Sequence, residues 1–115
     1  ASDRIMAVNR IEQEATINAE LLATLVNTLN SDESPNVRYA AMQALSNYMD
    51  VEQVRYELVK SLEAQTDPLI QISLITILIE AMEKSARVPM QKLIEREETL
   101  PEVKQQAEIA LKILV

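Results

Sequence analysis

The sequence contains no glycine, cysteine, histidine, tryptophan or phenylalanine, and its only aromatic residues are three tyrosines. Hairpins and barrels need residues with positive φ at their turns, and glycine supplies most of them. The absence of glycine therefore favours a fold made of helices. It also excludes the Gly-rich loops with which P-loop and dinucleotide-binding proteins hold phosphate groups.

The lack of cysteine and histidine restricts the chemistry that the chain can perform. It removes thiolate nucleophiles, disulfide bonds and histidine bases, and the usual ligands of structural zinc. We therefore expect no catalytic residues, no metal site and no cofactor, and we interpret the protein as a non-enzyme. A chain without cysteine suits the cytoplasm and the periplasm equally well, so the composition leaves the compartment open.

Basic residues are few, and the net charge is −7, from 18 acidic and 11 basic residues. A nucleic-acid groove needs clustered Lys and Arg, whereas these eleven are scattered, so we expect no nucleic-acid partner. The longest mainly apolar run, residues 72–79, is far shorter than the roughly 20 residues of a membrane span, so we expect no direct membrane contact. The acidic surface suits either solubility or a basic partner.

Apolar residues make up 48% of the chain, which is enough for a continuous core, and they follow an internal repeat. Pro35, Pro68 and Pro101 are spaced 33 residues apart. Each is expected to open a helix, because proline fits the first turn, where its missing N–H would have had no partner. The same apolar stripe follows each proline: Val37, Ala41, Ala44 and Leu45; Ile70, Leu74, Ile77 and Leu78; Val103, Ala107, Ala110 and Leu111.

Partner helices are predicted between these stretches, at about residues 19–29, 51–64 and 86–96, each with its own apolar stripe. The register of the third differs by one residue, so we expect a slightly longer loop after it. Residues 3–14 align with the second helix of a repeat. The sequence thus predicts an all-α chain of about seven helices in three and a half repeats.

Several helical repeats have periods near 33 residues, but the signatures of ankyrin and tetratricopeptide units are absent. Residues 32–45, DESPNVRYAAMQAL, resemble a HEAT repeat in their short acidic loop, proline, Val-Arg pair and apolar stripe. The resemblance implies an α-α superhelix of the armadillo type, a solenoid of stacked helix pairs. Residues 67–72, DPLIQI, are also similar to HEAT domains of bacterial proteins, some of which are fused to membrane-anchored zinc-finger regulators of the anti-sigma type. We expect residues 1–115 to be a single HEAT-like domain, and the start at Ala1 without Met suggests a fragment of a larger protein.

In HEAT stacks the second helix of each pair lines the concave side. The 33-residue period aligns two largely apolar rows there. We predict that a protein or peptide partner binds on these rows, whose apolar members are Ile5, Val8, Tyr39, Met42, Ile72 and Ile75. An equally weighted alternative buries the rows inside the stack, because the helix around residues 69–79 is apolar all round.

Polar residues recur at equivalent positions before the stripe: Arg4, Arg38, Gln71 and Lys104. We interpret them as structural ties between neighbouring turns, not as anion contacts. Tyr48 and Tyr56 are interpreted as packing residues. Glu95, Glu97 and Glu98 are interpreted as a solvated charged face and not as catalytic or metal-binding carboxylates.

These features favour a non-catalytic interaction scaffold that acts within a bacterial regulatory protein. Two alternatives remain open. One is a subunit of a HEAT-like lyase, a class that uses a partner subunit. The other is a purely structural module that self-associates through its apolar ends, of which the last helix, residues 109–115, is the more apolar.

Overall fold

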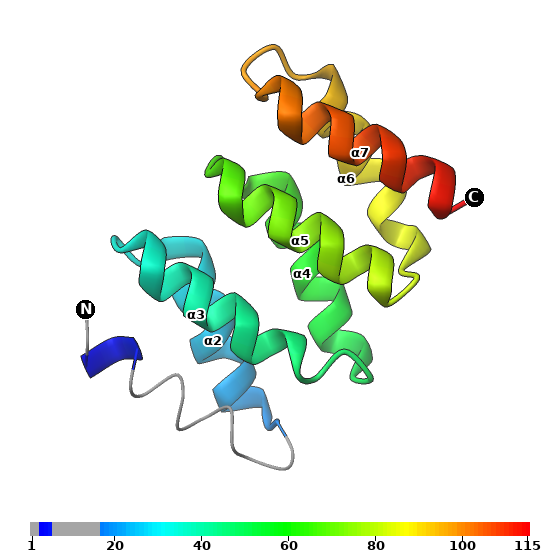
Figure 1. Ribbon diagram of the computed structural model, residues 1–115. Coiled ribbons are helices and arrows are strands. Elements are labelled where there is room, and N and C mark those ends of the chain that lie inside the picture. Colours follow the sequence, from blue (N-terminus) through cyan, green and yellow to red (C-terminus); the bar gives the residue numbers. More distant parts are fainter. Residues whose placement is uncertain (1–2, 6–16) are drawn as a thin grey trace. The chain divides into compact units, whose positions relative to one another are not determined.

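The computed structural model describes residues 3–5 and 17–115, and every regular element in these residues is a helix (Figure 1). The all-α class is therefore confirmed. Residues 3–5 are helical, and the remaining elements are α2 (Ala19–Ser31), α3 (Pro35–Ser46), α4 (Glu52–Ala64), α5 (Pro68–Glu80), the short 3₁₀ helix η1 (Lys84–Ala86), α6 (Arg87–Glu95) and α7 (Pro101–Ile113).

The prolines at the 33-residue period begin α3, α5 and α7, as predicted. The partner helices also lie close to their predicted ranges. The loop before α7, residues 96–100, is longer than the three-residue loops before α3 and α5, in agreement with the register shift. The predicted helix over residues 3–14 is observed at residues 3–5, and its remainder lies outside the described residues.

The chain forms two compact units, residues 1–54 and 55–115, with the border in the first turn of α4. In the first unit α2 and α3 form an antiparallel pair (Figure 1). Leu25 and Leu29 are the buried residues of α2, and the buried residues of α3 include Val37, Ala41 and Leu45. This spacing of four residues places one stripe of each helix in the core, as in any amphipathic pair.

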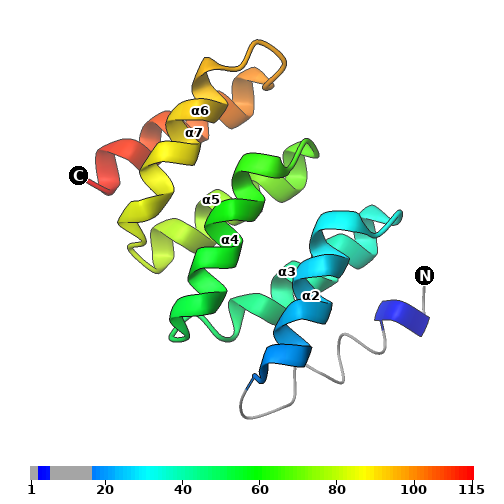
Figure 2. The same ribbon diagram turned by 180° about the vertical axis from the view of Figure 1, so that it is seen from behind.

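In the second unit α7 packs against both α6 and α5. Figures 1 and 2 show α5 and α7 running in the same direction, with α4 and α6 on the opposite face. The core of this unit includes Leu74, Leu78, Leu93, Val103 and Ala107, all fully buried. The four α-helices α4 to α7 of this unit thus alternate in direction, as expected for two antiparallel helix pairs that follow each other in the chain. The single domain expected over residues 1–115 stays a prediction.

Side-chain caps explain where two of the proline-led helices begin. Ser34 accepts a hydrogen bond from the Val37 N–H at 3.4 Å, and Asp67 accepts from Leu69 and Ile70 at 2.9 and 3.2 Å. Both residues precede the proline and satisfy N–H groups that have no partner within the helix. Leu100 holds the equivalent position before α7 and provides no such bond.

The helix C-termini are closed without glycine, and polar side chains contribute at the ends of α2, α4 and α7. Arg38 Nη1 donates to the carbonyl oxygen of Asp32 at 3.0 Å, and Gln71 Nε2 donates to that of Gln65 at 2.8 Å. Both bonds satisfy carbonyls that a helix end leaves free. Two further arginines act in the same way. The Arg87 guanidinium donates to the carbonyl oxygen of Leu111, and the Arg96 guanidinium donates to that of Glu63.

The end of α5 instead uses a Schellman motif. Met82 N–H donates to Ile79 O at 2.9 Å, and Glu83 N–H donates to Leu78 O at 3.0 Å. This motif needs a left-handed residue, usually glycine, and Met82 fills the position with φ of 51°. The chain therefore forms at this turn a conformation that glycine would adopt at lower cost.

Candidate functional site

The predicted binding row is only partly exposed. In the first unit Tyr39 and Ile5 are half-buried, and Met42 is fully buried. Val8 lies outside the described residues. In the second unit Ile72 is half-buried and Ile75 is fully buried.

Met42 and Ile75 are therefore core residues, which corrects their expected place on a binding surface. Each directly follows a buried residue of the repeat stripe, Ala41 and Leu74, so the core is wider here than the stripe alone. For these two residues the alternative of burial inside the stack applies, and the all-round apolar pattern of α5 is the reason for that alternative. The same pattern could not show which residues of α5 face outward, because it has no polar side.

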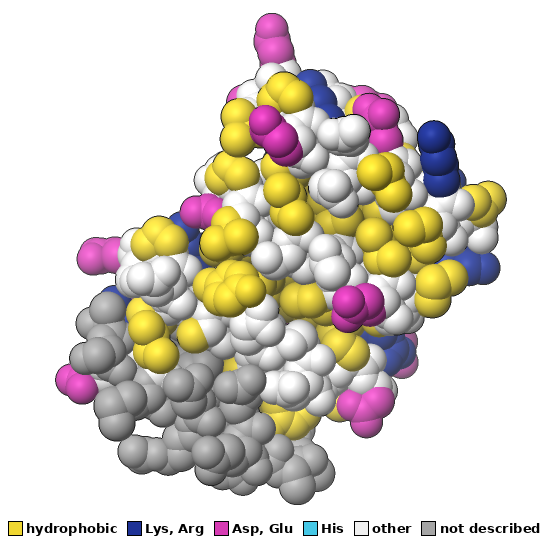
Figure 3. Space-filling model, viewed as in Figure 1, with side chains coloured by type: hydrophobic (Ala, Val, Ile, Leu, Met, Phe, Trp, Pro, Cys, Tyr) yellow, Lys and Arg dark blue, Asp and Glu magenta, His cyan; other side chains and the backbone are white. Residues whose placement is uncertain are grey.

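Three of the exposed large apolar residues lie along what we call the outer stripe of α5 and α7. The stripe consists of Leu69, Ile72 and Thr76 in α5 and of Gln105, Ile109 and Ile113 in α7, so it also includes the half-buried Ile72 and two polar residues. Leu69, Ile109 and Ile113 are 61%, 44% and 46% exposed. Figure 3 shows hydrophobic side chains gathered on the face where α5 and α7 lie in front.

The repeat makes the two isoleucines of α7 unusual. The residues equivalent to Ile109 are Gln43 and Thr76, and those equivalent to Ile113 are Asn47 and Glu80. α3 and α5 thus carry polar residues where α7 carries isoleucine. This signal was present in the sequence, but it lies outside the rows chosen for the binding prediction.

Of the four residues predicted to form polar ties, Arg4, Arg38 and Gln71 do so, but Arg38 and Gln71 act within a helix pair. Each binds a carbonyl six residues earlier, at the end of the preceding helix. Ties between successive pairs in the second unit come from other residues. Lys92 forms an ion pair with Glu63 at 2.7 Å, and Arg55 forms one with Glu83 at 3.0 Å.

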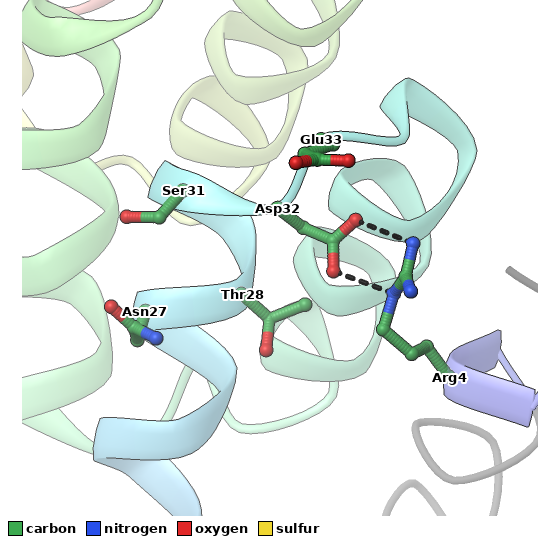
Figure 4. Close-up of a pocket in the computed structure, with 6 residues that line it drawn as sticks. All are labelled: Arg4, Asn27, Thr28, Ser31, Asp32 and Glu33. Atoms are coloured by element: carbon green, nitrogen blue, oxygen red, sulfur yellow. Dashed lines mark hydrogen bonds and ion pairs between the residues drawn. The ribbon is translucent and has the colours of Figure 1, made fainter.

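Arg4 fulfils its predicted structural role in a polar pocket of about 410 Å³ (Figure 4). Its Nε and Nη2 atoms lie 2.7 and 3.1 Å from the two carboxylate oxygens of Asp32. Asp32 Oδ1 also accepts from the Ser34 N–H at 2.9 Å. Because the carboxylate is engaged on both oxygens, the geometry is that of an ion pair anchoring residues 3–5 and not of a proton-transfer site.

Two glutamates of the second unit have lowered pKa values. The hydrogen bond from Lys92 lowers the pKa of Glu63, and the charges of Lys92 and Arg96 act in the same direction. The hydroxyl of Ser85, 2.7 Å from Oε2, lowers the pKa of Glu83, helped by Arg55. Both carboxylates are thus stabilised as anions, as suits ion pairs.

A second, smaller pocket of about 40 Å³ lies where the loops before α5 and α7 meet. We call it the loop pocket, and its lining residues are Thr66, Pro68, Gln71, Arg96, Glu98, Thr99 and Leu100. Thr99 is only 6% exposed, and its Oγ1 atom has no hydrogen-bond partner in the structure. A buried hydroxyl without a partner is uncommon in folded proteins.

Other candidate groups offer less. Glu95, Glu97 and Glu98 are exposed, and no group of three or more potential metal ligands occurs among residues 3–5 and 17–115. Tyr48 is buried, as predicted, whereas Tyr56 is exposed and its ring lies 5.4 Å from the Lys60 ammonium, so the packing interpretation is wrong for Tyr56. No helix in the described part of the chain is long and apolar enough to cross a membrane.

Comparisons of the chain with protein-family models, with curated protein sequences and with solved structures give no match.

Proposed function

We propose that this chain is a non-catalytic, HEAT-like repeat module that binds a protein or peptide partner. The observation that supports the proposal is the outer stripe of α5 and α7. There, apolar side chains are exposed on helices whose opposite faces are held in the core, and exposed apolar surface on a rigid scaffold is typical of interaction sites.

The outer stripe replaces most of the row predicted from the sequence. Ile72 belongs to both surfaces. The stripe adds Leu69, Ile109 and Ile113, and it omits Met42 and Ile75 because their side chains are buried. A bacterial origin and a place in an anti-sigma-type regulator stay part of the proposal and rest on the sequence resemblance alone.

Composition supports a binding role over catalysis. The sequence lacks histidine and cysteine, the residues used most often as bases and nucleophiles near neutral pH. Among the described residues, the two carboxylates with lowered pKa values, Glu63 and Glu83, are stabilised as anions in ion pairs. A catalytic acid needs the opposite shift.

The proposal is tested by selecting helical peptides that bind the full chain from a display library and measuring their affinity for variants. Ile109→Glu and Ile113→Glu are expected to weaken binding at least tenfold and to leave the melting temperature nearly unchanged, because both side chains are about half exposed. The matched control is Val88→Glu, since Val88 is 61% exposed but lies on α6.

Selected peptides that bind all three variants as tightly as the wild type would refute binding on the outer stripe. Failure to select any peptide would count against the function itself. Light scattering examines self-association in the same samples. A wild-type dimer that Ile113→Glu converts to a monomer would favour the structural alternative, in which the apolar end of α7 pairs with a second copy.

A further inference from the structure

The outer stripe continues to a glutamate at one end of each helix. Glu80 is the last residue of α5 and follows Thr76 by four residues. Glu102 is the second residue of α7 and precedes Gln105 by three residues. These spacings keep both glutamates on the same side of their helix as the stripe. Both are exposed, and among the described residues neither forms an ion pair, so both carboxylates are open to a partner.

The two helices carry their apolar and acidic residues in opposite order. The side of α5 that bears the stripe begins apolar and ends acidic, whereas that of α7 begins acidic and ends apolar. In chain order the residues are Leu69, Ile72, Thr76 and Glu80 in α5, and Glu102, Gln105, Ile109 and Ile113 in α7. By the 33-residue period, Leu69 is equivalent to Glu102, and Glu80 is equivalent to Ile113.

The apolar residues therefore form a diagonal across the two helices. Both helices have 13 residues, run in the same direction and pack together, so equivalent positions lie at similar heights (Figures 1 and 2). We call Leu69, Ile72, Ile109 and Ile113 the diagonal band, and they occupy positions 2, 5, 9 and 13 of their helices. These steps of three and four residues match the spacing of side chains along one face of a helix.

The length of the diagonal band suits a short partner helix. Its ends differ in height by eleven residues of helix, a rise of about 16 Å. The axes of packed helices lie about 8–10 Å apart, so the two ends of the band are about 19 Å apart. A helix of about 13 residues has this length.

The two glutamates lie on opposite sides of the diagonal band. Glu102 is level with Leu69 on the neighbouring helix, and Glu80 is level with Ile113 in the same way. The outer stripe and these two glutamates include no basic residue, although the exposed Lys112 directly precedes Ile113. A helix that covers the band would thus bring one flank against Glu102 and the other flank against Glu80.

We propose that the diagonal band binds an amphipathic helix of a partner protein whose apolar stripe has a lysine or arginine on each flank. The apolar side chains of the partner pack on the band, and its two basic residues pair with Glu80 and Glu102. Exposed ion pairs add little affinity, so the glutamates act mainly by repelling helices with acidic flanks. This inference rests on the proposed function, because it names the chemistry of the partner and its course across α5 and α7.

The probe is a 14-residue helical peptide with one leucine stripe, a lysine on each flank and glutamine elsewhere. It is labelled with fluorescein and titrated with the full chain, and the matched peptide carries glutamate in place of both lysines. Fluorescence anisotropy is expected to show that the lysine peptide binds at least about fivefold more tightly than the glutamate peptide. Equal affinities would overturn the inference, because apolar contact alone would then explain binding.

A double variant separates the two local ion pairs from general charge attraction. Glu80→Lys with Glu102→Lys changes the net charge from −7 to −3, since each substitution adds two positive charges. The chain stays acidic, yet the preference is expected to reverse in favour of the glutamate peptide. A preference for the lysine peptide that persists in this variant would overturn the inference.

Single charge variants measure each contact. Glu80→Gln and Glu102→Gln are each expected to weaken binding of the lysine peptide about two- to fivefold, the range of one exposed ion pair. The control is Glu108→Gln, because the exposed Glu108 is equivalent to the fully buried Ile75 and therefore lies off the stripe. Equal weakening by Glu108→Gln would contradict the assigned contacts.

Apolar variants test the diagonal course. Leu69→Ala and Ile113→Ala, at opposite ends of the band, are each expected to weaken binding of the lysine peptide about three- to tenfold. Their melting temperatures should stay nearly unchanged, because the two side chains are 61% and 46% exposed, and Val88→Ala on α6 is the control. A loss from Ile113→Ala with none from Leu69→Ala would overturn the inference, since the helix would then lie along α7 alone.

Failure of the inference is distinguishable from failure of the proposed function. Library peptides that bind the outer stripe when neither designed peptide binds would overturn the inference and support the function. If no peptide binds the chain, whether designed or selected, both are refuted.

Discussion

Met82 has a left-handed backbone, with φ of 51°, although it carries a side chain that is largely exposed. The left-handed region costs about 1–2 kcal/mol for a residue with a Cβ atom. A glycine at this position avoids this cost, but it lowers the free energy of unfolding by about 0.5–1 kcal/mol because the unfolded chain gains conformational freedom. We therefore expect Met82→Gly to raise the free energy of unfolding by about 0.5–1 kcal/mol, measured by urea denaturation. Ala81→Gly is the control. Ala81 is right-handed, with φ of −82°, so its replacement should destabilise the protein.

Glu83 is expected to make stability depend on pH in the acid range. Its pKa in the folded protein lies below the usual value near 4.5, chiefly because Ser85 donates hydrogen bonds to the carboxylate. A lowered pKa contributes stability that is fully present above the pKa of the unfolded chain and is lost as the pH falls through the folded pKa. Glu83→Gln should thus be less stable than the wild type at pH 7 and should approach it at pH 2–3. Ser85→Ala should raise the pKa of Glu83 in an NMR titration; an unchanged pKa would contradict the assigned cause.

At the scale of the helices, the end of α4 depends on a side chain from α5. Gln71 is almost fully buried, and its amide is 2.8 Å from the Gln65 carbonyl oxygen. Gln71→Met keeps the size of the side chain but leaves the carbonyl without this donor, which should cost about 1–3 kcal/mol of unfolding free energy. Gln105→Met, on the exposed side of α7, should cost much less. Equal losses in the two variants would show that the bond does not stabilise the helix end.

The positions of the helices and the buried stripes of α3 and α7 could be predicted from the sequence, but the outward face of α5 could not. Pro35, Pro68 and Pro101 mark helix starts because proline is tolerated in the first turn, and this rule does not depend on packing. The orientation of a helix depends on a contrast between polar and apolar sides, and α5 has almost none. The burial of Ile75 and the exposure of Leu69 therefore emerge only from the packed structure. The loop pocket was equally hidden, because it joins residues about 30 positions apart.

For the whole molecule, the division into two compact units has a measurable consequence. Ile75 is fully buried in the second unit, so Ile75→Ala should lower the free energy of unfolding by about 2–5 kcal/mol. Ile72→Ala, at a half-buried position of the same helix, should lower it less. Because proteins open in contiguous cooperative segments, the loss from Ile75→Ala should be concentrated in the unit that contains it.

Amide hydrogen exchange measures this distribution. In Ile75→Ala we expect protection to fall most in α5 and α7, which pack together, and to fall less in α2, which pairs with α3 in the first unit. The continuous helix α4 crosses the border between the units, so some of the loss should reach its first turn. An equal loss of protection in α2 and α7 would mean that all the helices open as one cooperative body. The units would then differ in their contacts and not in their stability.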